Sequence, residues 1–137
     1  MATRACIDLT RATIRSYTVK AASAVTAFKA VKFNTSDETQ ALDCTAGDQA
    51  DGYALETGAA GDVVQVATFI SGGAAKALVG TGGCTVGDWL KVVSDGVTTI
   101  TPGGGTTLRQ VVGRALQTGV AGDHVAVELT HFATVSS

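Results

Sequence analysis

The stretch that decides the fold is Ala60-Gly61-Asp62, followed at once by the β-prone run Val63–Ile70. Glycine reaches the positive φ that a tight turn needs, and an aspartate carboxylate accepts a hydrogen bond from nearby backbone and so opens the next strand. Within the run, Val64, Val66 and Ile70 share one face of a strand, because side chains alternate with a period of two. The sequence therefore predicts a turn that leads directly into a β-strand.

The same phrase recurs along the chain, and each further copy predicts another turn. It is read at Ala46-Gly47-Asp48, Val86-Gly87-Asp88 and Ala121-Gly122-Asp123, and Ser94-Asp95-Gly96 is similar. The β-prone runs that follow these turns are Trp89–Val93, Val97–Ile100 and Val125–Phe132. The spacing is too irregular for a solenoid, so we expect hairpins within one domain.

The remaining segments predict more short strands joined by polar or glycine-rich turns. We expect a hairpin turn at Gly72-Gly73 and loops at Gly80–Gly83 and Pro102–Gly105. The further strands are expected at Tyr17–Lys20, Val25–Phe33, Ala41–Thr45, Gly52–Glu56, Ala74–Val79, Cys84–Val93 and Val111–Gln117. Roughly nine to eleven short strands with frequent turns indicate an all-β fold, a small single-domain β-barrel or sandwich.

Length and composition are those of one globular domain with a core of small side chains. The chain has 137 residues, is 45% hydrophobic and contains seven aromatic residues, so Val, Ala, Leu and Ile must fill the core. No run approaches the ~20 apolar residues of a membrane span, and no apolar region marks a secretory signal. Cys6, Cys44 and Cys84 lack paired spacing, which argues against a disulfide framework or zinc site and favours synthesis in a reducing cytoplasm.

Charge is unevenly distributed, and this separates the N-terminal segment from the rest. Residues 1–32 have a net charge of +5, whereas residues 33–137 have −7. We predict that residues 1–15 form an extended arm and residues 16–137 the β-rich domain. The basic segment is either a surface that faces an acidic partner or a solvated face with a chance bias.

No combination of residues in the sequence predicts catalysis or a bound cofactor. His124 and His131 are the two histidines, and a separation of seven places them on opposite faces of one strand. We expect His124 in solvent and His131 partly buried beside Val127 and Leu129. The glycine clusters lack the lysine of a phosphate loop, and the Gly-Asp phrases lack the regularity of a calcium array. Nucleic-acid binding is disfavoured because the body of the chain is acidic, and Trp89 is either a core anchor or an exposed interface anchor.

An ordered series of phrases between Tyr17 and Phe132 resembles the capsid cement, or decoration, proteins of tailed bacteriophages. Its members are Ala24-Val25 through Val31-Lys32-Phe33, Asp51-Gly52-Tyr53-Ala54, Ala60-Gly61-Asp62-Val63-Val64-Gln65-Val66, Val86-Gly87-Asp88-Trp89-Leu90, Val112-Gly113-Arg114-Ala115-Leu116 and Ala121-Gly122-Asp123-His124-Val125-Ala126-Val127-Glu128-Leu129. The resemblance implies a β-tulip-like fold and homotrimers at the three-fold positions of an icosahedral head. It implies a structural virion protein that binds the major capsid protein on the outer surface of the head and stabilises it, without catalysis, cofactor or metal.

The arm lies outside the matched phrases and carries the residues that we expect to contact the shell or another subunit. These candidates are Arg4, Ile7, Leu9, Arg11, Ile14 and Arg15. The arm could instead pack on its own body. The alternative functions are a phage tail, baseplate or host-surface binding module, and a small hydrolase or metal enzyme.

Overall fold

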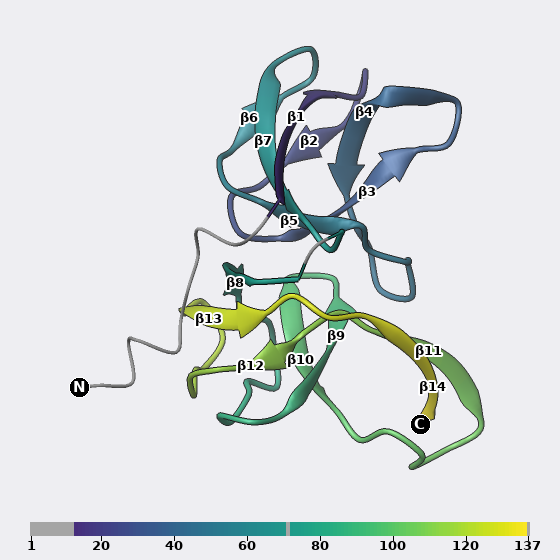
Figure 1. Cartoon of the computed structure of the whole chain (residues 1–137), viewed down its shortest axis with the longest axis vertical. Coiled ribbons are helices and arrows are strands. Elements are labelled where there is room, and N and C mark those ends of the chain that lie inside the picture. Colours follow the sequence, from purple (N-terminus) through teal and green to yellow (C-terminus); the bar gives the residue numbers. More distant parts are fainter. Residues whose placement is uncertain (1–12, 71, 137) are drawn as a thin grey trace.

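The computed structural model describes residues 13–70 and 72–136, and the regular elements of these residues are all β-strands (Figure 1). No helix in this part of the chain is long and apolar enough to cross a membrane. The strands are β1 (Thr13–Val19), β2 (Ala24–Val25), β3 (Ala30–Asn34), β4 (Asp37–Asp43), β5 (Gly52–Ala54), β6 (Gly58–Ala59), β7 (Val63–Thr68), β8 (Ala74–Leu78), β9 (Trp89–Val93), β10 (Gly96–Ile100), β11 (Thr107–Val111), β12 (Arg114–Ala115), β13 (His124–Glu128) and β14 (Phe132–Ser136). The prediction of an all-β fold is confirmed.

The first half of the chain forms a closed five-stranded barrel in the order β1-β4-β3-β5-β7. β1 pairs antiparallel with β7 from Thr13↔Thr68 to Thr18↔Val63, and it meets β4 in parallel at Val19↔Ala41. The barrel interior is filled by small and aromatic side chains, namely Tyr17, Val19, Val25, Val31, Ala41, Ala54, Val64 and Val66. Closure leaves the five-stranded barrel sheet without an edge strand, and β2 and β6 pair separately in a two-stranded sheet.

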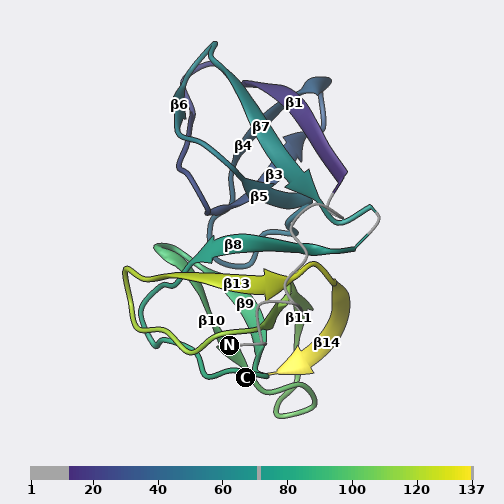
Figure 2. The same cartoon turned by 60° about the vertical axis from the view of Figure 1, so that its left-hand side comes forward.

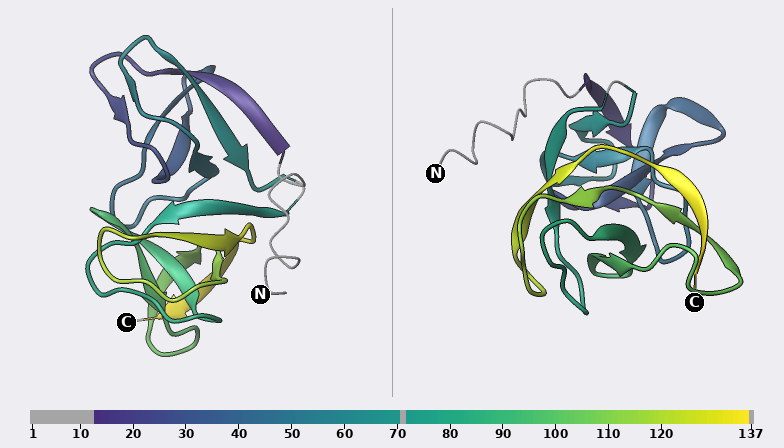
Figure 3. Two further views of the ribbon diagram at one scale, coloured as in Figure 1. Left: turned by 90° about the vertical axis from the view of Figure 1, so that its left-hand side faces the viewer. Right: turned by 60° about the horizontal axis from the view of Figure 1, so that its bottom comes forward.

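The second half contains a five-stranded sheet in the order β10-β9-β12-β13-β8. Its outer strands approach each other, because Val79 forms a parallel bridge with Val97 and the amide of Gly80 donates to the Val97 carbonyl at 2.8 Å. The two units are stacked along the long axis of the molecule, and β8 of the lower unit faces the upper one (Figures 2 and 3). The lower sheet thus nearly closes into a barrel of its own.

The two units are copies of one motif, related by a shift of about sixty residues. Residues 52–62 read GYALETGAAGD and residues 113–123 read GRALQTGVAGD, so eight of the eleven positions are identical. The hydrogen bonds repeat as well: Ala27 N donates to Thr57 Oγ1 and Val86 N donates to Thr118 Oγ1, each at 3.0 Å. Strands β1, β3, β4, β5 and β7 therefore correspond to β8, β9, β10, β12 and β13.

The two copies share one hydrophobic core and so form a single domain. The shared cluster includes Tyr53 and Phe69 from the first copy and Leu90, Val112 and Val127 from the second. The Tyr53 hydroxyl donates to the carbonyl of Val112, and its ring packs edge-on against Phe69 at 5.8 Å. Burial raises the pKa of Tyr53 above its usual value, so the phenol stays a neutral donor.

The C-terminal ribbon of β11 and β14 has no counterpart in the first copy. The two strands pair antiparallel from Thr107↔Ser136 to Val111↔Phe132. Gln110 ties the ribbon to the first copy, because its Oε1 accepts from Ala50 N at 2.6 Å and its Nε2 donates to Ala50 O at 3.2 Å.

Several strands predicted from the sequence are confirmed, whereas other predictions are wrong in strand bounds, strand pairing or burial. Trp89–Val93 and its hairpin partner around Ser94-Asp95-Gly96 are found as predicted, although the strand predicted from Cys84 begins only at Trp89. The single strand predicted at Val25–Phe33 is two strands, because a turn at 26–29 with Phe28 at φ 68° separates β2 from β3. The hairpin predicted at Gly72-Gly73 is a crossover, because β7 pairs with β1 and β5 whereas β8 pairs with β13.

The other corrections concern strand ends and burial. The strand predicted at Val111–Gln117 is interrupted, because Gly113 at φ 152° separates β11 from β12. The run predicted as one strand to Phe132 ends at Glu128, and His131 is exposed rather than partly buried. Ile70 lies beyond β7 and is 63% exposed, so it does not share the buried face of Val64 and Val66.

Candidate binding site

The repeated Gly-Asp turns form the scaffold around the site. In the turns ending at Asp48, Asp62, Asp88 and Asp123, the glycine has φ between 88° and 93°. Each aspartate carboxylate accepts the backbone N–H three residues earlier at 2.8–3.0 Å, and each aspartate N–H returns a bond of 3.0 Å to that same residue. This is the geometry of a type II turn, which requires glycine at its third position. The predicted role of these phrases in turns is confirmed.

The predicted arm residues fall in two groups. Arg4, Ile7, Leu9 and Arg11 lie outside the described residues. Ile14 and Arg15 belong to β1, where they pair with Ala67 and Val66. β1 begins at Thr13, so residues 13–15 are part of the first barrel.

The structure places Ile14 and Arg15 at different surfaces. Ile14 is 49% exposed and lines an apolar groove of about 240 Å³ at the junction of the two copies. The other residues of this groove are Phe28, Leu55, Ala67, Ala74, Ala75 and Lys76. Arg15 instead borders a shallow depression beside Tyr17 and Phe33, whose rings are stacked at 4.5 Å.

The histidines and the two described cysteines are separated from one another. His124 is exposed, as predicted, and lies 4.7 Å from the ring of Phe28, whereas His131 lies 5.0 Å from the ring of Phe69. Cys44 and Cys84 are buried free thiols, and burial raises the pKa of Cys44 to about 12. Within residues 13–70 and 72–136, no three His, Cys, Asp or Glu side chains could hold a metal ion together.

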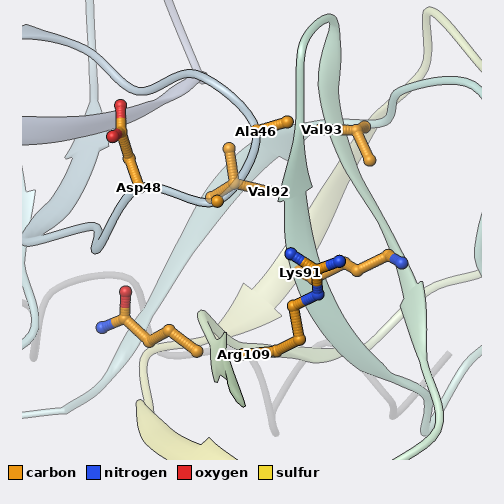
Figure 4. A pocket seen from close by; sticks show the side chains of 8 residues that line it. Ala46, Asp48, Lys91, Val92, Val93 and Arg109 are labelled. Atoms are coloured by element: carbon orange, nitrogen blue, oxygen red, sulfur yellow. The ribbon is translucent and has the colours of Figure 1, made fainter. Parts of the chain in front are cut away.

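A cleft of about 110 Å³ lies where the Thr45–Asp48 turn meets β9 and β11 (Figure 4). Its lining residues are Ala46, Gly47, Asp48, Lys91, Val92, Val93, Arg109 and Gln110. Arg109 rises from β11 toward β9, where Lys91 lies, and the Asp48 carboxylate points away from Arg109 (Figure 4).

The cleft has more positive side chains than acidic partners for them. Lys32 Nζ lies 2.7 Å from Asp48 Oδ2, and this hydrogen bond, followed by the bonds from Thr45, holds the pKa of Asp48 below its usual range. Arg109 Nε is buried and has no acceptor among the described residues. The Lys91 side chain likewise makes no ion pair or hydrogen bond with the described part of the chain. The arrangement leaves two cations available to an external anion.

A second groove of about 370 Å³ adjoins the cleft on the other side of β11. The two share Gly47, Arg109 and Gln110, and the groove is completed by Gln49, Leu108, His131, Phe132 and Ala133. Leu108 is 71% exposed and Phe132 38% exposed.

Half-buried Trp89 lies close to this second groove. Its ring packs edge-on against Phe132 at 5.1 Å, and the Arg114 guanidinium lies over it at 5.4 Å. The sequence left open whether Trp89 is a core anchor or an exposed interface anchor, and in the structure its side chain is neither fully buried nor fully exposed.

Sequence reasoning missed this cleft. One feature of the sequence could have indicated it, namely a basic residue close to apolar residues in each of the two strands. Lys91 lies between Leu90 and Val92, and Arg109 lies two residues before Val111. That β9 and β11 meet at this point was not visible in the pattern, because the two strands belong to different sheets.

No protein-family model and no curated protein sequence matches this chain. Among solved structures, the N-terminal base of the head fiber gp8.5 of bacteriophage phi29 is similar, with a TM-score of 0.62 and 20% sequence identity. The alignment covers 86% of this chain and 93% of that one. At this level of identity the similarity establishes the architecture, and the chain shares the all-β fold of a phage head fiber base.

Proposed function

We propose that the chain is a structural virion protein that attaches to the outer surface of an icosahedral phage head. The observation that supports this most strongly is the fold shared with a head fiber base over 86% of the chain. The phrases that resemble the cement proteins supply a second, independent argument, because they run in order through both copies of the motif.

In this proposal the partner is the major capsid protein, and the chain acts as a homotrimer at three-fold positions. A protein that binds the assembled shell but not its separated subunits stabilises assembly by mass action. Three linked copies would also bind with avidity, so modest contacts in each subunit suffice. The protein would be made in the bacterial cytoplasm and would need no cofactor, metal or catalytic step.

The arm is the proposed contact with the shell or a neighbouring subunit. Arg4 and Arg11 of residues 1–12 supply positive charge, Ile7 and Leu9 supply apolar surface, and Arg15 of β1 adds a positive charge on the barrel. An extended basic segment of this kind can add to the sheet edge of a partner. The acidic body gains little attraction to an acidic shell surface by itself.

The test is assembly with the shell protein encoded in the same genome. We expect shells produced with this chain to carry additional density on their outer surface, with three-fold symmetry when imaged by electron microscopy. Shells produced without it should lack that density and dissociate at lower denaturant concentration. Density only on tails, or no association with either, would contradict the proposal and favour a tail or host-binding module.

A further inference from the structure

The cleft beneath the Thr45–Asp48 turn has an excess of positive charge built into its walls. Lys91 and Arg109 both line it, and neither is paired with an acidic group of the described chain. Asp48 is the one carboxylate in the lining, and Lys32 already matches its charge at 2.7 Å. A partly buried guanidinium without an acceptor loses hydration without compensation, so an incoming anion gains a strong charge-assisted bond there.

The position of Arg109 explains why its guanidinium is held in the cleft. On β11 it lies on the same face as Val111, which is fully buried, and it pairs with Thr134 of β14. Gln110, on the opposite face, clamps the backbone of Ala50 with two hydrogen bonds and fixes the strand beside the Thr45–Asp48 turn. The donor is therefore preorganised, which lowers the entropic cost of binding.

The adjoining groove indicates a ligand larger than a free anion. It shares Arg109 with the cleft and adds Leu108 and Phe132, two exposed apolar side chains. A polypeptide with an acidic residue next to an apolar one could place its carboxylate in the cleft and its apolar side chain in the groove. The surrounding chain from residue 33 onward has a net charge of −7, so an acidic segment would be repelled elsewhere and directed to this cleft.

We propose that the cleft binds the carboxylate of an Asp or Glu side chain in an acidic segment of a partner protein. Arg109 and Lys91 hold the carboxylate, and Phe132, which pairs with Val111 and so lies on the Arg109 face of the ribbon, contacts the apolar residue beside it. The site is a property of this chain and does not depend on attachment to a phage head.

The test is a titration of the full chain with a capped peptide, acetyl-Ala-Glu-Leu-Ala-amide, followed by ¹H–¹⁵N NMR. We expect saturable shifts of the Arg109 Nε–Hε signal and of the β9 and β11 amides. The matched peptide with Gln in place of Glu should bind about tenfold more weakly, because it lacks the charge. Arg109→Gln and Lys91→Gln should each weaken binding of the Glu peptide, whereas Lys76→Gln, an exposed lysine on β8, should leave it unchanged.

Three results would overturn the proposal. They are equal binding of the Gln peptide, equal binding of inorganic phosphate, and the absence of saturable shifts up to about 10 mM peptide, which would mean a Kd above the millimolar range. The comparison of the Glu and Gln peptides needs no variant, so it decides the matter even if Arg109→Gln fails to fold. Arg109→Met serves as a second variant, and its melting temperature should equal or exceed that of the wild type because an unpaired donor is removed.

Discussion

At the scale of single residues, the Gly-Asp turns depend on backbone conformation rather than on space. Gly61 and Gly122 have φ of 88° and 93°, yet a Cβ added to either would meet nothing within 4 Å. The stability lost on substitution at these positions therefore reports the strain of a left-handed backbone conformation, without a contribution from clashes with neighbouring atoms.

We expect Gly61→Val and Gly122→Val each to lower the free energy of unfolding by about 1–3 kcal/mol, because a β-branched residue is strained at positive φ. The measurement is chemical denaturation followed by circular dichroism. Gly104→Ser is the control, because Gly104 lies in the 102–105 loop without a positive φ, and the nearest atoms to an added Cβ all belong to Thr101, with its carbonyl oxygen at 3.2 Å. Equal losses for all three variants would show that turn strain does not matter.

The carboxylate of Asp48 predicts a pH dependence. Its pKa is lowered in the folded protein by the hydrogen bond from Lys32 and then by those from Thr45. A lowered folded pKa gives stability that is present above the unfolded value, near 3.8, and is lost as pH falls toward the folded value. We expect Asp48→Asn to lose stability at neutral pH and to show a shallower decline below pH of about 4 in thermal unfolding.

The control for this experiment is Glu56→Gln, which removes an exposed carboxylate that has no hydrogen bond or ion pair within the described chain. It should reproduce the wild-type curve. If Asp48→Asn loses stability below pH of about 4 as steeply as the wild type, other carboxylates account for the decline. Candidates are Asp37 and Asp95, whose pKa values are also lowered by hydrogen bonds from Thr39 and Thr81.

At the scale of elements, β1 is the first strand of the barrel and directly follows residues 1–12. Deleting residues 1–12 should leave the melting temperature close to that of the full chain, because β1 begins at Thr13. Deleting residues 1–19 should unfold the protein, since β1 pairs with β7 over six positions and closes the barrel against β4. Circular dichroism measures both outcomes.

The same truncations test the proposed contact. The folded protein without residues 1–12 should no longer cosediment with shells, and Arg15→Ala, which keeps β1, should weaken binding and reduce its sensitivity to salt, since exposed charges are screened over about 10 Å at 0.1 M. A truncated protein that still binds with unchanged salt dependence would refute a docking role for the arm.

Local patterns predicted individual elements better than their pairing. β9 and β10 follow directly from alternating residues around a Ser-Asp-Gly turn. The Gly72-Gly73 prediction failed because two glycines mark a turn without saying which strands it joins. Alternation also fails in β7, whose end is buried on both faces: Val66 packs inside the first barrel, whereas Ala67 and Phe69 pack in the shared core. The cleft escaped prediction for the same reason, because its residues come from turns and strands that meet only in three dimensions.

At the scale of the whole molecule, the shared core makes the two copies depend on each other. Tyr53 is fully buried, and its hydroxyl reaches the Val112 carbonyl in the other copy. We expect Tyr53→Phe to lower the free energy of unfolding by about 1–3 kcal/mol, because Val112 O loses its partner in a buried site. Denaturation should remain a single transition by both fluorescence and circular dichroism. Two separate transitions would show that the copies fold independently.

The repetition of residues 52–62 in 113–123 was open to detection from the sequence alone, since eight of eleven positions agree. The four Gly-Asp phrases are unevenly spaced, so their positions alone do not indicate the longer match between residues 52–62 and 113–123. The first copy has also diverged at its turns: Phe28 occupies a left-handed position that Gly87 fills in the second copy. Such substitutions lower the sequence similarity between the two copies, although the backbone hydrogen bonds of the turn are the same in both.

The repetition also means that this polypeptide is, in effect, a covalently fused dimer. Either half made alone would expose to water the surface that now packs on its counterpart, including the rings of Tyr53 and Phe69 or the side chain of Leu90. Fragments 13–70 and 72–136 should therefore be poorly folded in isolation and recover the native spectrum when mixed. An ancestor encoding a single copy would have met the same requirement by self-association, and fusion of two copies would have freed each half to change independently, as the ribbon carried only by the second half illustrates.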